Sequence, residues 1–336
     1  MITQTDLEKY DPSGMHNVYD DWPSMAEQSY ESEIELIDVK DIDHVVFAGM
    51  GGSGTIGDIF SSILSKNNIH VSIVKGYTLP KTVDDQTLVV TTSISGNTVE
   101  TLNVLESAKK LGIKIIGFSS GGKMQDYCEK NNMNHRIIPF SHSPRSSFTS
   151  FLYSMLKCLG PILPIDRNSI LESIKELEKT SAQISSSNLD EKNPSLNLSD
   201  WITNIPLIYY PWGLESAAIR FKNSLQENAK IHAITENVIE GCHNSIVSFE
   251  RPSTINPILL EGVDDYEKTK ERWNILKEFF YESNIKYREI FSIRGNILSK
   301  LINLIYVLDY SSIYLAVKNK TDPTPVPSID FIKKRL

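Results

Sequence analysis

The chain has 336 residues, with 34 basic and 42 acidic side chains and a net charge of −8. That length suits about two domains, and the acidic balance argues against binding to nucleic acid or to an anionic membrane surface. Three isolated cysteines form no C-x-x-C pair, which argues against a disulfide framework or a structural zinc site. The N-terminal segment has no signal-peptide pattern, and no apolar run approaches the roughly 20 residues of a membrane span, so we expect a cytoplasmic protein.

The first half alternates short β-branched runs with helix-length segments. Strands are predicted at residues 44–49, 70–75, 87–93, 114–120 and 135–140, and helices at 53–64, 97–111 and 124–132. This alternation is the βαβ pattern of a parallel sheet covered by helices on both faces. We therefore assign residues 1–150 to a first α/β domain.

A second series of the same kind follows a connecting region. Residues 169–184 predict a charged helix, and residues 185–200, rich in Ser, Asn and Asp, predict a surface connection. Later strands are predicted at 205–212, 230–235, 253–262 and 286–291, and helices at 214–229, 266–283 and 296–318. The sequence thus predicts an α/β fold with two three-layer domains and parallel sheets, an internal duplication. Residues 151–200 are the connecting helices and surface linker, and residues 201–336 are the second domain.

The glycine-rich stretch "VVFAGMGGSGTIGD" (45–58) follows the first strand. Gly49, Gly51 and Gly54 have the G-x-G-x-x-G spacing of a dinucleotide site, but the second strand ends in Lys75, where such a site has an acidic residue. A P-loop requires a lysine after the last glycine, and Thr55 stands there instead. Dinucleotides and nucleoside triphosphates are therefore disfavoured. A smaller phosphate remains, as does the plain alternative that the glycines only permit close packing.

A second polar turn, "TTSISGNTVET" (91–101), also lies between an apolar strand and an amphipathic helix. Ser93, Ser95 and Thr98 place hydroxyls around the turn, and Asn97 is predicted to cap the helix, with Glu100 three positions on. The start of a helix offers N–H donors and a positive dipole end, so hydroxyls and amides can hold a phosphomonoester without a lysine. The alternative is that these hydroxyls only cap the helix.

The two turns belong to a longer set of motifs in a specific order. These are "DPSGM", "GMGGSG", "SISGNTVET", "SPR", "QENAK", "CHNS" and the tail "DPTPVPSIDFIKK". Over nearly its whole length the chain resembles the archaeal-type bifunctional phosphoglucose/phosphomannose isomerases, which are sugar isomerase (SIS) domain proteins. The resemblance implies two SIS domains and a homodimer. It also implies interconversion of glucose 6-phosphate, or mannose 6-phosphate, with fructose 6-phosphate through a cis-enediolate, without metal or cofactor.

The resemblance also implies roles for individual residues. Glu227 corresponds to the base that moves a proton between two sugar carbons, and His243 to the ring-opening residue, supplied from the neighbouring subunit. Arg145 corresponds to the residue that stabilises the enediolate. Without the resemblance, a surface glutamate, a surface histidine and a surface ion pair are the simpler interpretations of these three.

The remaining implied residues contact the substrate. The phosphate is assigned to Gly52, Ser53, Ser93, Ser95 and Thr98. Further substrate contacts are assigned to Gly51, Lys333 and Thr324. Lys334 is the alternative to Lys333, and a register shift of two residues puts Val326 in place of Thr324.

Three other functions compete with this interpretation. A metal-dependent phosphomannose isomerase of the β-barrel kind is disfavoured, because the seven histidines form no H-x-H or H-x-x-x-H set. A non-catalytic sugar-phosphate sensor fits the phosphate-binding turns equally well. Another SIS sugar-phosphate isomerase is the third, and such enzymes usually lack the "ENAK…HN" pair.

Overall fold

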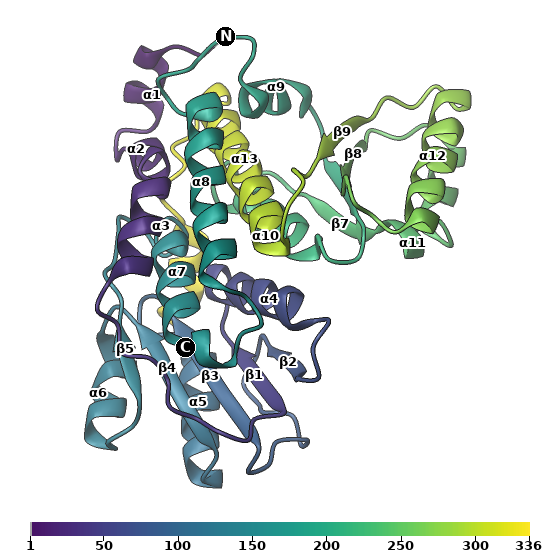
Figure 1. Cartoon of the computed structure of the whole chain (residues 1–336). Helices are drawn as coiled ribbons and strands as arrows, with labels where there is room; N and C mark the ends of the chain where they lie inside the picture. Colours follow the sequence, from purple (N-terminus) through teal and green to yellow (C-terminus); the bar gives the residue numbers. More distant parts are fainter. Residues whose placement is uncertain (1) are drawn as a thin grey trace. The chain divides into compact units, whose positions relative to one another are not determined.

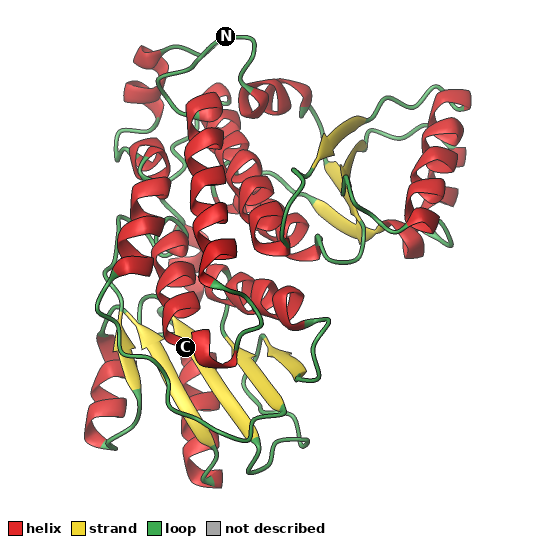
Figure 2. Ribbon diagram, viewed as in Figure 1, coloured by secondary structure: helices red, strands yellow, loops and turns green. Residues whose placement is uncertain are grey.

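The computed structural model describes residues 2–336 and forms two compact units (Figures 1 and 2). We call Asp21–Ile174 with Pro327–Leu336 the N-sheet unit. Residues 2–20 with Lys175–Val326 form the C-sheet unit. Each unit is therefore built from two separate stretches of the chain.

The N-sheet unit contains a five-stranded parallel sheet. Its strands are β1 (His44–Ala48), β2 (His70–Val74), β3 (Thr87–Ser93), β4 (Lys114–Ser119) and β5 (His135–Ile137), in the order β2-β1-β3-β4-β5. Every residue of β1 and β3 is buried, as expected for central strands covered on both faces. Its helices are α3 (Trp22–Glu31), α4 (Gly52–Leu64), α5 (Val99–Leu111), α6 (Gly122–Lys130), α7 (Phe148–Cys158) and α14 (Pro327–Lys333), with the short 3₁₀ helix η1 (Gly160–Ile162).

Alternation along β1 separates the two helical layers of this unit. Val46 and Ala48 form one apolar cluster with Val104 and Ala108 of α5, while Phe47, on the opposite face, stacks on Phe60 of α4 at 5.1 Å. Because successive strand residues point to opposite faces, α4 and α5 cover opposite sides of the sheet. The result is a three-layer α/β/α arrangement (Figure 1).

The C-sheet unit repeats this plan with four strands. They are β6 (Pro206–Tyr210), β7 (Ile234–Asn237), β8 (Asn256–Glu261) and β9 (Arg288–Phe291), all parallel, in the order β7-β6-β8-β9. Its helices are α1 (Gln4–Tyr10), α2 (Met15–Asp20), α9 (Pro194–Trp201), α10 (Glu215–Glu227), α11 (Val238–Gly241), α12 (Glu267–Glu282) and α13 (Ile297–Lys318), with the 3₁₀ helix η2 (Ser245–Glu250). Helix α8 (Arg167–Ile184) begins in the N-sheet unit and ends in this one. The predicted fold class, two α/β domains with parallel sheets, is confirmed.

Helix α13 forms the core of the C-sheet unit. It is long and apolar enough to cross a membrane, yet 83% of its most apolar 18-residue window is buried inside the protein. Tyr306 donates a hydrogen bond to the carbonyl of Tyr19, and Tyr310 donates to the carboxylate of Asp20 at 2.6 Å. The helix is therefore buried by packing against its own unit.

The structure differs from the predicted surface connection at 185–200 in its second half. Asn193 caps α9 by accepting hydrogen bonds from the amides of Ser195 and Leu196, at 2.9 and 3.1 Å. Leu196 and Leu198 are buried, and α9 packs on α13. The polar composition here supplies a helix cap and buried hydrogen bonds, which composition alone cannot distinguish from a solvated loop.

Candidate functional site

In the turn after β1, the backbone at Gly49 lies close to the backbone of the first turn of α4. A Cβ on Gly54 would lie 2.9 Å from the carbonyl oxygen of Gly49, so only glycine fits there. Gly51 stands at the N-cap with φ +54°, a conformation that favours glycine, and it is exposed. Helix α4 thus begins at a surface-accessible turn, and its first-turn amides, which include those of Gly52 and Ser53, have no partner within the helix.

The turn after β3 holds its hydroxyls in a fixed arrangement. Ser93 is 1% exposed and donates a hydrogen bond to Thr98 Oγ1 at 2.9 Å. The Ser95 hydroxyl accepts from the amide of Asn97 at 3.3 Å. Gly96 has φ +69°, and a Cβ there would lie 1.8 Å from the carbonyl oxygen of Gly121. The turn is therefore locked between β3 and the start of α6.

A hydrogen bond joins these two turns to each other: Ser53 Oγ accepts from the amide of Ile94 at 3.4 Å. Ser120, which follows β4, donates to the carbonyl of Ile94 at 2.6 Å and so holds the turn after β3 from its other side. β1 and β3 are adjacent in the sheet, and the strand order runs outward from them in opposite directions, to β2 on one side and to β4 on the other. Such a reversal of strand order is the topological switch point where open α/β sheets bind ligands. The residues assigned to the phosphate, which are Gly52, Ser53, Ser93, Ser95 and Thr98, therefore lie on these two neighbouring turns, as does the proposed substrate contact Gly51.

The predicted capping role of Asn97 is wrong. The N-cap of α5 is Thr98, which makes no side-chain cap hydrogen bond. Asn97 instead donates to the carbonyl of Ser95 at 2.9 Å and accepts from the amide of Lys123 at 3.2 Å. Its amide group is occupied by a tertiary contact with α6, so it cannot cap α5.

Arg145 lies in a serine-rich turn that leads into α7. Its side chain is 6% exposed. Ser147 Oγ donates towards the carbonyls of Ser141 and Ser143, both at 2.9 Å, and Trp22 Nε1 donates to the carbonyl of Ser146 at 3.2 Å. These bonds fix the backbone on either side of Arg145. The sequence analysis missed this supporting role, and the signal for it was the run of serines around "SPR".

Glu227 is the last residue of α10 and is half-buried. Two turns earlier on the helix, the buried Arg220 forms an ion pair with Asp309 of α13 at 2.7 Å. Burial acts to lower the pKa of Arg220, but Asp309, Tyr19 and Glu227 outweigh it, so that its pKa is raised. A permanent positive charge therefore lies within electrostatic range of the Glu227 carboxylate.

His243 lies between α11 and η2 and is exposed. Its amide donates to the carbonyl of Glu240 at 2.8 Å, and Asn244 donates to the Glu240 side chain at 2.9 Å. The backbone at this position is therefore held by its own short helix while the imidazole faces solvent.

The two tail residues lie in different units. Thr324 belongs to the C-sheet unit and is half-buried, and its amide donates to Asp322 at 2.8 Å. Lys333 lies in α14 of the N-sheet unit and is exposed, as is Lys334. Across residues 2–336, no three His, Cys, Asp or Glu side chains gather in a way that could hold a metal ion.

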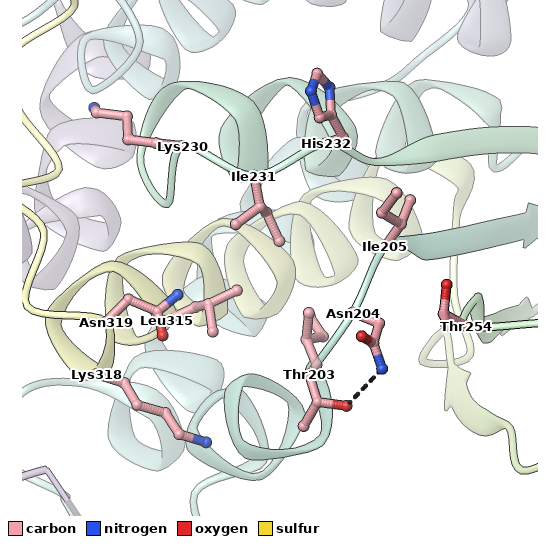
Figure 3. A pocket seen from close by; sticks show the side chains of 11 residues that line it. Thr203, Asn204, Ile205, Lys230, Ile231, His232, Thr254, Leu315, Lys318 and Asn319 are labelled. Atoms are coloured by element: carbon pink, nitrogen blue, oxygen red, sulfur yellow. Dashed lines mark hydrogen bonds between the residues drawn. The ribbon is translucent and has the colours of Figure 1, made fainter.

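A pocket of about 620 Å³ lies in the C-sheet unit (Figure 3). Apolar side chains of Ile205, Ile231 and Leu315 line it, and Lys230 and Lys318 stand at its border. Figure 3 shows the Lys230 side chain extending away from Ile231. Its ammonium group donates to the carbonyl of Glu227 and, at 3.2 Å, to that of Pro323.

Comparison with known proteins gives matches along the whole chain. The profile of the SIS domain matches residues 38–156, and that of the bacterial phospho-glucose isomerase C-terminal SIS domain matches residues 191–336. The bifunctional phosphoglucose/phosphomannose isomerase of Caldicellulosiruptor bescii is 34% identical, over 94% of this chain and 96% of that protein. The protein of the same name from Aquifex aeolicus is 28% identical, over 87% of this chain and 90% of its own.

A solved structure shows the same fold. The C-terminal domain of glucosamine-fructose-6-phosphate aminotransferase from Francisella tularensis superposes with a TM-score of 0.70 at 15% identity. The superposition covers 93% of this chain and 98% of that one.

Proposed function

The chain belongs to the bifunctional phosphoglucose/phosphomannose isomerase family, and on this premise we propose that it interconverts glucose 6-phosphate and mannose 6-phosphate with fructose 6-phosphate. The observation that carries the proposal is the hydrogen-bonded pair of turns at the β1–β3 switch point. Two helix starts and several hydroxyls there suit a compact phosphomonoester dianion. We assign the phosphate to Gly52, Ser53, Ser93, Ser95 and Thr98, with Gly51 beside the substrate.

The reaction requires a proton to leave C2 of the open-chain aldose and return to C1, through a cis-enediolate. One carboxylate can make both transfers, and we assign them to Glu227. Arg145 is the proposed stabiliser of the enediolate, since a guanidinium keeps its charge at all working pH values. We assign further substrate contacts to Lys333 and to Thr324.

We assign ring opening to His243, whose imidazole can carry a proton between the ring oxygen and a hydroxyl near neutral pH. His243 is exposed, and Ile239 and Val247, each four positions away in the sequence, are exposed apolar residues, 37% and 57% accessible. Exposed apolar side chains around a functional group suit a protein interface. We therefore propose a homodimer in which each His243 serves the site of the neighbouring subunit. A cytoplasmic location fits such a sugar-phosphate enzyme.

A coupled assay with both aldose phosphates, on protein treated with EDTA, tests the function. We expect isomerisation of both substrates, whereas activity lost to chelation and restored by zinc would contradict the proposal. Ligand binding without turnover would instead identify a sugar-phosphate sensor.

The base is tested by Glu227→Gln. Loss of the proton-transferring carboxylate should lower kcat by about 10²–10⁴-fold, while fructose 6-phosphate still binds. Glu282→Gln is a matched control, because Glu282 also ends a helix of the C-sheet unit and is exposed. Unchanged turnover in Glu227→Gln would remove the assignment.

A further inference from the structure

The turn after α10 places Lys230 in an unusual backbone conformation. Its φ is +58°, a backbone conformation that residues other than glycine rarely adopt. The chain nevertheless folds back there, since the amides of Ala229 and Ile231 both donate to the carbonyl of Leu225, at 3.1 and 3.3 Å. Asn228, buried beside it, donates to Ser312 of α13 at 2.9 Å. The surroundings therefore hold this turn in place.

The ammonium of Lys230 joins two parts of the C-sheet unit that are far apart in sequence. It donates to the carbonyl of Glu227 and to the carbonyl of Pro323, 93 residues later. A lysine at this point also suits the negative end of the α10 dipole. One cation thus ties the end of α10, which carries the proposed base, to the segment that carries Thr324.

The ammonium group of Lys230 points away from the apolar lining of the neighbouring pocket (Figure 3). Lys230 borders that pocket, but its side chain extends away from Ile231 (Figure 3). Lys318, at the same border, is paired instead with Asp200 at 2.7 Å. Two lysines of one pocket therefore have different partners, and only Lys230 contacts the residue proposed as the base.

We propose that Lys230 is a positioning residue that sets Glu227 relative to Thr324 and thereby influences the preference between the two aldose phosphates. The inference rests on the proposed function. Glucose 6-phosphate and mannose 6-phosphate differ only in configuration at C2, the carbon that the base deprotonates. A change in the position of the Glu227 carboxylate relative to Thr324, the proposed substrate contact, acts unequally on two substrates that differ at C2. Small displacements also have large effects on proton transfer.

The test compares Lys230→Met with Lys230→Arg and Lys318→Met. Methionine keeps a flexible unbranched side chain, one atom shorter than that of lysine, and loses the donor. We expect kcat to fall about tenfold, in line with the sensitivity of catalysis to placement. The ratio of kcat/KM for the two aldose phosphates should shift at least about threefold, with the KM for fructose 6-phosphate changed less. Arginine, which can donate to both carbonyls, should restore the ratio, and Lys318→Met should leave both quantities unchanged.

Lys230→Gly covers the case in which methionine prevents folding, because glycine adopts the positive φ without strain. It should show the same shift in ratio. The inference is overturned if both variants keep the ratio and kcat of the unmutated protein. It is also overturned if they lose activity equally for both aldoses and arginine gives no rescue, since that pattern is a general structural defect. If the unmutated protein isomerises neither substrate, the proposed function fails first and the inference fails with it.

Discussion

The two sheets carry contrasting groups at their equivalent carboxyl edges. Between β1 and β3 the turns supply glycines and hydroxyls. Between β6 and β8 they supply carboxylates: Glu215 opens α10 and accepts from Tyr210 at 3.3 Å. Asp265 accepts from the amide of Gly262 at 2.9 Å and from Trp273 at 3.1 Å. In the C-sheet unit, acidic side chains thus occupy the positions where an anion would compensate a helix start.

The contrast shows how two domains of the same fold can differ in their suitability for binding an anion. In the C-sheet unit, Glu215 and Asp265 lie in sequence at or just before the helix starts of α10 and α12, whereas the first turn of α4 in the N-sheet unit contains no acidic residue. A phosphate dianion at the start of α10 or α12 would meet like charge. We therefore expect one phosphate site per chain, in the N-sheet unit, and the predictions below test that division.

The largest effect is expected from Gly96→Ala. The new Cβ would lie 1.8 Å from a backbone oxygen at φ +69°, so the turn after β3 must move. We expect the free energy of unfolding to fall by about 3 kcal/mol or more, with a large rise in KM. Gly213→Ala is the control in the C-sheet unit, with φ +95° and no neighbour within 4 Å of the new Cβ.

Gly213→Ala should lose only about 1–2 kcal/mol of stability from backbone strain and keep its KM. Urea unfolding and steady-state kinetics check both variants. Equal losses in the two would show that the turn after β3 has no special constraint.

A smaller effect is expected from Ser93→Ala. The role proposed for the Ser93 hydroxyl is to bond the charged phosphate, and loss of such a bond costs about 1.5–3 kcal/mol. That loss corresponds to a rise in KM of roughly 10–100-fold. Ser216→Ala is the control in the C-sheet unit: Ser216 is 1% exposed, near the start of α10, and its hydroxyl has no hydrogen-bond partner within residues 2–336. Its KM should stay within about twofold of the unmutated value, since no phosphate is expected there. A parallel rise in both would place anion binding in both halves.

The smallest effect concerns the pH dependence of the C-sheet unit. Burial raises the pKa of Glu261 from 4.5 to about 7, with the neighbouring Glu289 adding to the rise and Lys277 opposing it. The folded state thus holds this proton more tightly than the unfolded state. Stability is lost as the pH rises from about 4.5 through 7. Glu261→Gln, always neutral, should therefore be more stable than the unmutated protein at pH values above 7 by about 1–3 kcal/mol.

The gain should vanish near the ordinary pKa of a glutamate, where the carboxyl group is protonated in the folded state. Denaturant unfolding in acidic and in alkaline buffer measures the difference. Glu271→Gln is the control, because Glu271 pairs with Lys268 at 2.8 Å with both side chains more than half exposed. It should change stability by less than about 1 kcal/mol at either pH. A gain for Glu261→Gln that is independent of pH would contradict the mechanism.

Sequence reasoning succeeds where the determinants are local. The runs of β-branched residues at β1 and β3 predict buried parallel strands, and the glycines and serines that follow predict the turns that connect each strand to its helix. These features depend on residue periodicity and on backbone conformations that neighbouring residues dictate.

Sequence reasoning fails where a side chain bonds to or packs on a residue far away in the sequence. Asn97 has the sequence position of a cap, but the amide of Lys123 on α6 occupies its oxygen. Residues 194–201 have the composition of a loop, yet α13 supplies a surface on which their leucines are buried. The contact of Lys230 with Pro323 spans 93 residues, and no local pattern specifies it.

The hydrogen bonds of Tyr306 and Tyr310 with Tyr19 and Asp20 have a consequence for biosynthesis. These partners are separated by 287 and 290 residues. At roughly 5–20 residues per second on a ribosome, α13 follows α2 by roughly 15–60 s. During that interval the nascent N-terminal helices lack the surface that later buries them and remain open to chaperones and proteases. The C-sheet unit therefore becomes complete in one late step, once α13 has left the ribosome.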